Sequence, residues 1–475
     1  MKAYTLRVEA DRFVTLEYGQ KRPGETGTPI QITVEGQDFK ADVPLPRGSA
    51  IEGTLLDEFG DPAPSVLVQI ATKVYAAGRQ RLMPVGSRLQ TAPSDDKGHY
   101  RIIGVAPGEY HVAALSGVYT DQNEVGGFAP TYSPGTTDAG AAVPVTVAFG
   151  ADTTASFALA PAKTVSVSGT MVDASGQAVG RGTLVLGPPD RLQRMDFNTA
   201  RAVTAPDGKF VLRNVPTGMY TLQGFGVPPP GYQGPGNLAA MPFGWAALTV
   251  GDADVDAVVL KVSAGTSLRG RIAFDDDGAA RPKPDQVRVT AIPVEFDSAP
   301  MGGGPTPSET HEDWTFEARL MSGMRRIFVN VGSTSWVLKK VTHNDMDVTD
   351  IPVDTRTKDL DNIEILLTSK VSKVGGSVTD DKGPVRDYAV VIFSSDPTKW
   401  IDRSRFVALG RPNQAGRFDV RGLPPEEYLA VALPNVVQTE WMSPEFLQQL
   451  RPLATGFALQ EGESKTLELK LRKRP

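Results

Sequence analysis

Hydrophobic and polar residues alternate along most of this chain, in short runs that glycine, proline and aspartate interrupt. Residues 166–172 read Ser-Val-Ser-Gly-Thr-Met-Val, residues 209–212 read Lys-Phe-Val-Leu, and residues 220–222 continue the pattern. A period of two is typical of β-strands that bury one face. Runs of four to seven residues predict about seven strands per hundred residues, the density of a small antiparallel β-sandwich.

One segment departs from this alternation. Residues 443–450 read Ser-Pro-Glu-Phe-Leu-Gln-Gln-Leu. Serine is a favourable N-cap, proline fits the first position of a helix, and Pro452 would end the run. The sequence therefore predicts a short helix in an otherwise β-rich chain.

A first pattern, Gly-x-x-x-Asp-x-x-Gly, recurs three times. It comprises Gly53, Asp57 and Gly60, then Gly169, Asp173 and Gly176, then Gly376, Asp380 and Gly383. The aspartate can accept hydrogen bonds from backbone amides just ahead of it, and the last glycine can take a positive φ. We expect each copy to close a turn after the first strand of a unit. Calcium ligation by these aspartates is the alternative, and turn geometry is favoured over it.

A second pattern places a tyrosine ten residues beyond a Gly-x-aromatic sequence. It comprises Gly98, Tyr100 and Tyr110, then Gly208, Phe210 and Tyr220, then Gly416, Phe418 and Tyr428. The aromatic residue and the tyrosine are expected to face a core, with the tyrosine hydroxyl bonded to a backbone group at its rim. Recurrence of both patterns at about one hundred residues indicates an array of similar domains.

The gap between the second and third copies predicts a further, divergent unit. Gly169 and Gly376 stand 207 residues apart, twice the period. Residues 267–274 open like the other units, and residues 314–316, Trp-Thr-Phe, supply an aromatic strand. Arg326 stands ten residues beyond Phe316, where a tyrosine is expected. This unit keeps the alternation and loses the recurring residues.

The first 46 residues match the second half of a unit. Tyr4 and its successors correspond to the strand at Tyr110, and Pro29 and its successors to the strand at Pro144. We expect the front half of that unit to be missing because the start codon is misplaced, the gene is a fragment, or the chain begins in mid-domain, and we favour the first two explanations. The expected domains are residues 1–46, the C-terminal part of a truncated unit, then 47–161, 162–263, the divergent 264–369, and 370–475. Short spacers between them predict a bent rod.

Together the two patterns resemble the carboxypeptidase regulatory-like domain. Residues 128–137, Phe-Ala-Pro-Thr-Tyr-Ser-Pro-Gly-Thr-Thr, resemble a linker found in acidobacterial relatives. The resemblance is good for residues 47–161, 162–263 and 370–475, and weak for residues 264–369. It implies an all-β tandem array of about four seven-stranded antiparallel β-sandwiches, transthyretin-like or starch-binding-like. Such domains occur in secreted and envelope proteins of bacteria, and they carry no catalytic residues to transfer.

Composition excludes several classes of function. A net charge of −6 without a long basic stripe argues against nucleic-acid binding. No window reaches eighteen consecutive apolar residues, so no membrane-spanning helix is expected. Cysteine is absent, which removes disulfides and thiolate chemistry. From the resemblance we expect a periplasmic, outer-membrane associated or secreted protein, although no signal peptide precedes the first strand.

Residues that could carry chemistry are few. The chain has four histidines, none in a metal-binding spacing, and no nucleophile elbow or phosphate loop. Asp252, Asp254 and Asp256 start like a calcium loop, but Ala257 replaces its glycine and Ser263 its bidentate glutamate. We expect no enzyme activity, no cofactor and no metal.

Aromatic residues in loops offer one binding hypothesis. Trp245, Trp441 and Tyr232 are the candidates, since a flat ring packs well on the C–H face of a sugar. A core position is favoured for the tryptophans. Two functions therefore remain open: a non-catalytic scaffold or interaction protein with an unknown protein partner, and a carbohydrate-binding protein that uses these aromatics.

Overall fold

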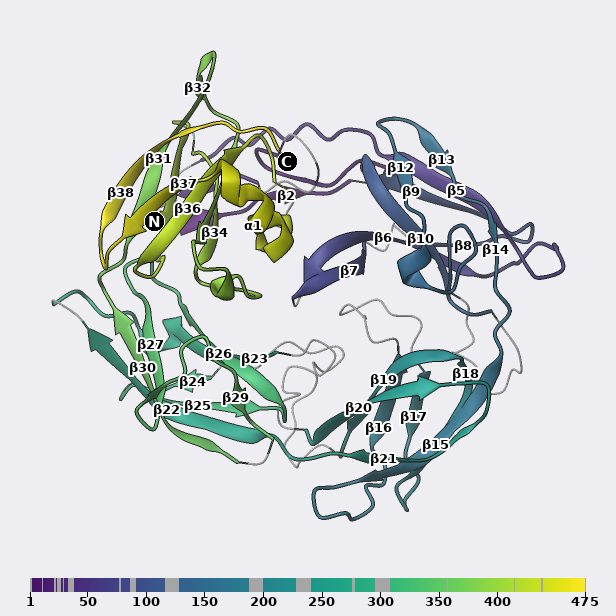
Figure 1. Cartoon of the computed structure of the whole chain (residues 1–475). Helices are drawn as coiled ribbons and strands as arrows, with labels where there is room; N and C mark the ends of the chain where they lie inside the picture. Colours follow the sequence, from purple (N-terminus) through teal and green to yellow (C-terminus); the bar gives the residue numbers. More distant parts are fainter. Residues whose placement is uncertain are drawn as a thin grey trace.

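The computed structural model describes residues 2–10, 12–20, 23, 27–28, 30–32, 38–76, 78–85, 91–115, 128–187, 200–227, 241–275, 278–294, 308–356, 358–413, 415–436 and 439–474. They are mostly β-structure, arranged as pairs of sheets that follow one another along the chain (Figure 1). The predicted all-β fold class is confirmed. We call the four successive pairs of sheets units 1 to 4.

Units 1 and 2 each consist of two facing sheets. In unit 1 these are β5 (Ser49–Leu56), β9 (His99–Val105), β13 (Asp152–Thr154) and β14 (Phe157–Ala158), and β6 (Leu67–Ala76), β7 (Arg79–Pro84), β8 (Thr91–Pro93), β10 (Gly108–Leu115), β11 (Thr131–Tyr132) and β12 (Val145–Val147). In unit 2 they are β15 (Thr164–Val172), β18 (Lys209–Pro216) and β21 (Val255–Lys261), and β16 (Thr183–Gly187), β17 (Ala200–Val203), β19 (Gly218–Phe225) and β20 (Phe243–Val250).

Units 3 and 4 repeat this plan. Unit 3 contains β22 (Thr266–Asp275), β24 (Glu309–Thr310), β25 (Thr315–Leu320), β27 (Val337–His343), β28 (Met346–Asp347) and β30 (Leu360–Thr368), facing β23 (Val287–Pro293), β26 (Met324–Val331) and β29 (Val353–Asp354). Unit 4 contains β31 (Lys373–Asp380), β32 (Gly383–Val385), β35 (Arg417–Arg421) and β38 (Ser464–Lys470), facing β33 (Ala389–Ser394), β34 (Val407–Gly410), β36 (Glu426–Leu433) and β37 (Thr455–Leu459). Short 3-10 helices are η3 (Ala139–Ala141), η5 (Pro284–Gln286), η7 (Pro397–Lys399), η8 (Glu440–Met442) and η9 (Arg451–Leu453).

Each unit encloses its own apolar core. Four separate clusters of buried residues each draw their members from a single unit. In unit 2 the alternation along β15 buries Val165, Val167 and Met171, where they meet Leu212 and Tyr220 from the other strands. The period of two seen in the sequence therefore separates a core face from a solvent face in each unit.

The first and last strands of every unit are parallel neighbours. Strand β5 pairs in parallel with β13 and β14, β15 with β21, β22 with β30, and β31 with β38. The other neighbours within the sheets are antiparallel, as expected. A parallel last strand brings the chain out at the end opposite to its entry, so the next unit can begin without a long connection.

The first glycine of the Gly-x-x-x-Asp-x-x-Gly pattern lies at this parallel contact. A Cβ added at Gly53, Gly169, Gly270 or Gly376 would lie 2.1, 2.0, 1.9 or 1.8 Å from a carbonyl oxygen near the unit's last strand. Such distances leave no room for a side chain. The glycine recurs because the two strands approach each other too closely for any other residue, and the divergent unit 3 obeys the same constraint.

The aspartates of the pattern close turns, as the sequence predicts. Asp173 Oδ1 accepts hydrogen bonds from the amides of Ser175 at 2.8 Å and Gln177 at 3.0 Å. Gly176 follows with a φ of +88°. Asp57 Oδ1 accepts two amide hydrogen bonds in the same way, both at 2.9 Å. These side chains therefore act in local backbone geometry.

The tyrosines of the second pattern brace the rim of each core. The hydroxyls of Tyr110, Tyr220 and Tyr428 each donate to the carbonyl four residues earlier, at 2.8, 2.9 and 2.9 Å. In unit 3 the equivalent residue is Arg325, and the expectation that Arg326 stands there is wrong by one position. Arg325 is 4% exposed, and its Nε donates to Met321 O at 2.5 Å, again four residues earlier. Arg325 lies nine residues beyond Phe316, whereas the tyrosines of the other units lie ten residues beyond their aromatic residue, so a fixed spacing of ten missed it.

The predicted helix is present as α1 (Pro444–Leu450) in unit 4. Ser443 is its N-cap, with Oγ accepting from the Phe446 amide at 3.4 Å. Phe446, Leu447 and Leu450 pack on the outer face of β33 and β36, in an apolar layer separate from the main core of the unit. One sheet of unit 4 is thus buried on both faces, which explains the continuous burial of β33.

The N-terminal segment (residues 1–46) forms two short antiparallel pairs, β1 (Lys2–Tyr4) with β4 (Ile30–Ile32) and β2 (Arg7–Val8) with β3 (Leu16–Glu17). Tyr4 pairs with Ile30 as Tyr110 pairs with Val145 in unit 1, the correspondence expected from sequence. In the part of the chain that the structure describes, no helix has the length and apolar character to span a membrane.

The four units follow one another around a ring, and the N-terminal segment lies between unit 4 and unit 1 (Figure 1). The hairpin of β6 and β7 extends from unit 1 toward α1, and β6 contacts η8 of unit 4. The chain is therefore curved further than the bent rod predicted from its short spacers, because contacts between its first and last units close it.

Candidate functional site

The aromatic candidates are placed in different units. Trp245, on β20, is partly buried beside an apolar cluster of Val185, Phe225, Phe243 and Met321, while Trp441, in η8, is partly buried against the layer under α1. Units 2 and 4 lie on opposite sides of the ring, so the two residues do not share a site (Figure 1). Tyr232 lies outside the described residues.

The aspartates of the incomplete calcium loop are bonded to a neighbouring strand. Asp254 Oδ1 accepts from the Ser166 amide at 2.8 Å, and Asp256 Oδ1 from Ser168 Oγ at 2.6 Å. These bonds fasten β21 to β15 at the edge of unit 2. Over the described ranges, no three His, Asp or Glu side chains gather in a way that could hold a metal ion.

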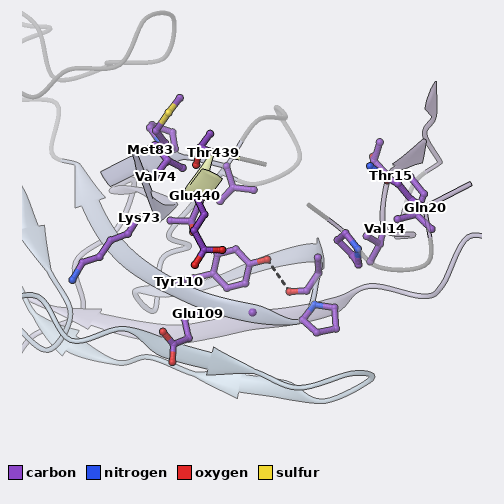
Figure 2. Close-up of a pocket in the computed structure, with 18 of the residues that line it drawn as sticks. Val14, Thr15, Gln20, Lys73, Val74, Met83, Glu109, Tyr110, Thr439 and Glu440 are labelled. Atoms are coloured by element: carbon purple, nitrogen blue, oxygen red, sulfur yellow. Dashed lines mark hydrogen bonds between the residues drawn. The ribbon is translucent and has the colours of Figure 1, made fainter. Parts of the chain in front are cut away.

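A cavity of about 1150 Å³ lies where the N-terminal segment, unit 1 and unit 4 meet. Figure 2 shows that Val14, Lys73, Tyr110 and Glu440 reach it from different elements. Small-ligand sites usually have volumes of roughly 300–1,000 Å³, and this cavity is slightly larger. It is therefore the main candidate site. Sequence reasoning missed it because its walls come from three distant parts of the chain.

The cavity forms where two strands of unit 1 diverge. Strands β10 and β6 are paired only as far as His111 and Ala71. Beyond that point β6 continues with β7 alone, while residues 108–110 of β10 pair with β12. Both branches line the cavity, and the N-terminal segment and the region around η8 cover it.

Charges of both signs surround this space. Its cationic residues are Arg7, Arg12, Lys73 and Arg474. Its anionic residues are Glu9, Glu17, Glu109, Glu440 and Glu445. Some are already paired, since Arg474 Nη2 contacts Glu440 Oε1 and Glu17 Oε2 accepts from the Gly27 amide at 3.0 Å. The cavity can therefore attract both cationic and anionic groups of a ligand.

Two buried polar atoms at the cavity have no hydrogen-bond partner. His111 is 3% exposed, and its Nδ1 is unpartnered; Glu440 Oε2 is likewise buried and unpartnered. Arg326 Nε is the third such side-chain atom among the described residues. Burial, assisted by Lys73, lowers the pKa of His111, which favours the neutral imidazole. Unsatisfied buried polar atoms are uncommon in proteins, so two at one cavity suggest a ligand.

The tyrosines of the cavity serve structure more than chemistry. Tyr75 is 5% exposed and Tyr110 is 7% exposed. Burial raises the pKa of both to about 12, and for Tyr75 the nearby Glu445 and Asp402 add to the effect. Both phenols are therefore protonated at neutral pH. The Tyr110 hydroxyl donates a hydrogen bond to Ala106 O at 2.8 Å.

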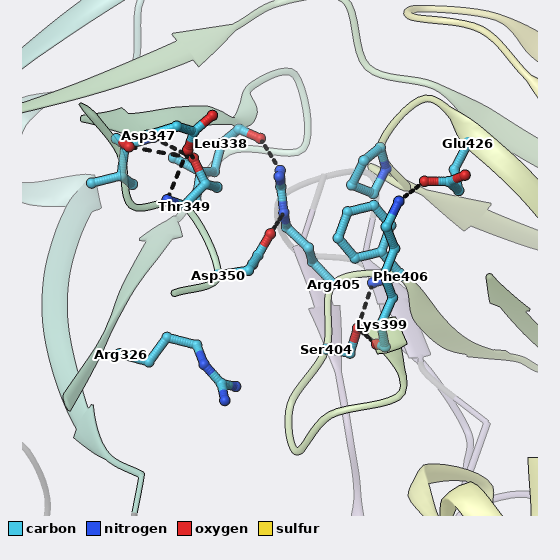
Figure 3. Close-up of polar contacts among 12 residues, drawn as sticks. Arg326, Leu338, Asp347, Thr349, Asp350, Lys399, Ser404, Arg405, Phe406 and Glu426 are labelled. Carbon is cyan, nitrogen blue, oxygen red and sulfur yellow. Dashed lines mark hydrogen bonds and ion pairs between the residues drawn. The ribbon is translucent and has the colours of Figure 1, made fainter. Parts of the chain in front are cut away.

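A second group of polar side chains lies between units 3 and 4 (Figure 3). Arg405 Nε lies 3.0 Å from Asp350 Oδ2, and its Nη1 donates to Leu338 O at 3.1 Å. Arg326 Nη1 donates to Asp402 O at 2.8 Å. Each of these bonds crosses from one unit to the other. These bonds hold units 3 and 4 together.

Comparisons with known proteins show distant similarity to solved structures and no other match. No family model matches the chain, and no curated protein matches it. Among solved structures, the Bacillus anthracis TIE protein is 11% identical, with 86% of this chain and 68% of that chain covered and a TM-score of 0.17. A streptococcal ancillary pilin is 14% identical, with 55% and 75% covered and a TM-score of 0.24.

Two B repeat units of the collagen-binding protein of Staphylococcus aureus are similar at the same level, at 12% identity, with 82% and 94% covered and a TM-score of 0.17. TM-scores this low carry no inference about function. The tandem β-sandwich architecture rests on the sheets and cores of this chain itself.

Proposed function

We propose that this chain is a non-catalytic, extracytoplasmic scaffold or interaction protein built of tandem carboxypeptidase regulatory-like domains. In this proposal the domains are residues 47–161, 162–263, 264–369 and 370–475, with residues 1–46 corresponding to the second half of a further unit. The protein acts in the periplasm, at the outer membrane or outside the cell. Its role is to present surfaces to other proteins at fixed spacing.

The main support for this proposal is that the recurring residues have structural roles. The repeated glycines lie where strands approach closely, the repeated aspartates close turns, and the repeated tyrosines bond to backbone carbonyls. The pattern that defines the units therefore defines their fold. No part of it forms a nucleophile with a base and an oxyanion site, which is what hydrolysis would need.

A second candidate function is carbohydrate binding through Trp245, Trp441 and Tyr232. Partial exposure of the two tryptophans favours it, since the accessible part of an aromatic ring can stack on a sugar. In this alternative each aromatic would contribute to a separate contact, because Trp245 and Trp441 belong to different units.

Cell fractionation and binding measurements on the full chain test these functions. The proposal expects the native protein in the envelope or the medium, no turnover of peptide or ester substrates, and no glycan binding. Glycan-array binding that Trp441→Ala abolishes and Trp441→Phe retains would favour the alternative, because phenylalanine keeps a flat ring. Hydrolysis of a peptide or ester that a point substitution abolishes would contradict both.

A further inference from the structure

We propose that the cavity between the N-terminal segment, unit 1 and unit 4 binds an extended peptide, with a basic group of the peptide placed at Glu440. This inference deepens the proposed interaction function and rests on it. The partner is a protein segment, and the site is made by the closure of the ring.

Glu440 supplies the first argument. One of its oxygens contacts Arg474, while the other, Oε2, is buried without a hydrogen-bond partner. A buried carboxylate oxygen without a donor is costly, and an ammonium or guanidinium group would satisfy it. A cationic group of a ligand can therefore bind to Glu440 Oε2 in the cavity wall.

His111 supplies the second argument. Its ring is 3% exposed and lines the same cavity, with Nδ1 unpartnered. It projects from β10, where that strand separates from β6. A ligand that reaches this point can give the imidazole the hydrogen bond that the protein does not provide. His111 Nδ1 and Glu440 Oε2 both lack a hydrogen-bond partner and belong to different units. One ligand that spans the junction between units 1 and 4 can bond to both.

Strand β7 supplies the third argument. Within the described ranges β7 pairs with β6 on one side and with no strand on the other. Gln80, Met83 and Pro84 of β7 line the cavity. An extended peptide can add to such an edge through its own amides and carbonyls, as in other cases of β-strand addition.

Charge favours a peptide over a sugar. The remaining cavity charges have both signs, so a segment with acidic and basic residues can form ion pairs with them, whereas a neutral sugar forms none. Aromatic burial does not decide between the two ligands. Tyr75, Tyr110 and Phe446 are each between 5% and 7% exposed, whereas Phe13, which also lines the cavity, is 37% exposed.

The test pans a phage-displayed library of short linear peptides against the immobilised full chain, then titrates the enriched peptide by calorimetry. Enriched peptides should share a Lys or Arg. Glu440→Gln should weaken their binding by at least about tenfold, as expected for loss of a charged hydrogen bond. Hydrogen exchange should slow in β7 when the peptide is bound.

A control variant separates the site from general effects. Glu468→Gln removes an exposed carboxylate elsewhere in unit 4 and should leave binding unchanged. Thermal melting establishes that each variant is folded.

Several outcomes would overturn this inference. Peptides that bind wild type and Glu440→Gln equally would refute this site and leave the interaction function standing. Glycan binding that Glu440→Gln abolishes would assign the cavity to a sugar instead. Failure to enrich any peptide would refute the peptide site, while cell fractionation would still test the proposed function separately.

Discussion

Substituting alanine for the glycine at the parallel strand contact should unfold one unit selectively. In unit 4 this residue is Gly376, where an added Cβ would lie 1.8 Å from Leu467 O, far below the 3.4 Å at which contact becomes ordinary. Strands β31 and β38 must then move apart, which disturbs a register that runs from Lys373 to Thr379. Overpacking costs roughly 1–3 kcal/mol. Loss of one or two backbone hydrogen bonds adds about 1 kcal/mol each. We expect a total of about 3 kcal/mol.

The neighbouring Gly375→Ala is the matched control. Its added Cβ would lie 3.2 Å from Phe418 O, a tight contact that a small shift relieves. Alanine also restricts the unfolded chain, which stabilises by about 0.4–1 kcal/mol. The net change at Gly375 should therefore stay within about 1 kcal/mol.

Hydrogen exchange measured by mass spectrometry on the full chain can distinguish the two variants. A loss of about 3 kcal/mol corresponds to about a hundredfold faster exchange through unfolding of the unit. For Gly376→Ala this acceleration should be confined to unit 4. Equal exchange in the two variants would refute the close-contact explanation, and acceleration in all four units alike would refute separate cores.

Three further predictions concern the other recurring or connecting residues. Tyr220→Phe should lower the stability of unit 2 by about 1 kcal/mol, since Pro216 O loses its donor; an unchanged melting temperature would contradict this. The hydrogen bonds from Ser175 and then the Gln177 amide lower the pKa of Asp173 below 3.8, so its contribution is present above pH 3.8 and is lost as the pH falls through the lower folded value. The stability difference between wild type and Asp173→Asn should therefore shrink as the pH falls below 3.8, and a constant difference would count against the assignment. Met321→Ala should weaken the apolar contact between units 2 and 3 by about 2 kcal/mol, measured as faster exchange in both units, and a change limited to unit 3 would argue against coupling.

The fold class could be predicted from sequence because it depends on local patterns. Alternation along residues 166–172 and the recurring turn residues determine strands and their ends. The helix at residues 444–450 was also predictable, because serine and proline mark its start. These features depend on neighbours along the chain.

Other features depend on contacts between distant segments. Position 53 must be glycine because a side chain there would clash with Ala155 O, about a hundred residues later in the chain. The sequence therefore shows that this glycine recurs but not why. In unit 3 Arg325 takes the place of the tyrosine, nine residues beyond Phe316 instead of ten, and its bond to Met321 O is visible only in the structure. A fixed spacing pointed to Arg326 instead, which contacts unit 4.

The candidate site could not be predicted from the sequence either, because segments that are distant along the chain form it. His111 lies on β10 and Glu440 in η8, and closure of the ring brings both to one cavity. One signal was available: His111 interrupts an apolar run that is buried from Tyr110 to Ala114. The sequence suggests loop positions for the aromatic candidates Trp245 and Trp441, whereas the structure places Trp245 on β20 and Trp441 in η8, each partly against an apolar cluster.

The most direct test of this account is the amide NMR spectrum of residues 162–263 expressed alone. If unit 2 encloses a core of its own, the fragment should give well-dispersed signals typical of β-structure and should melt in one cooperative transition. A collapsed, poorly dispersed spectrum in the random-coil range would show that unit 2 needs its neighbours to fold, and would contradict the description of the chain as four separate sandwiches.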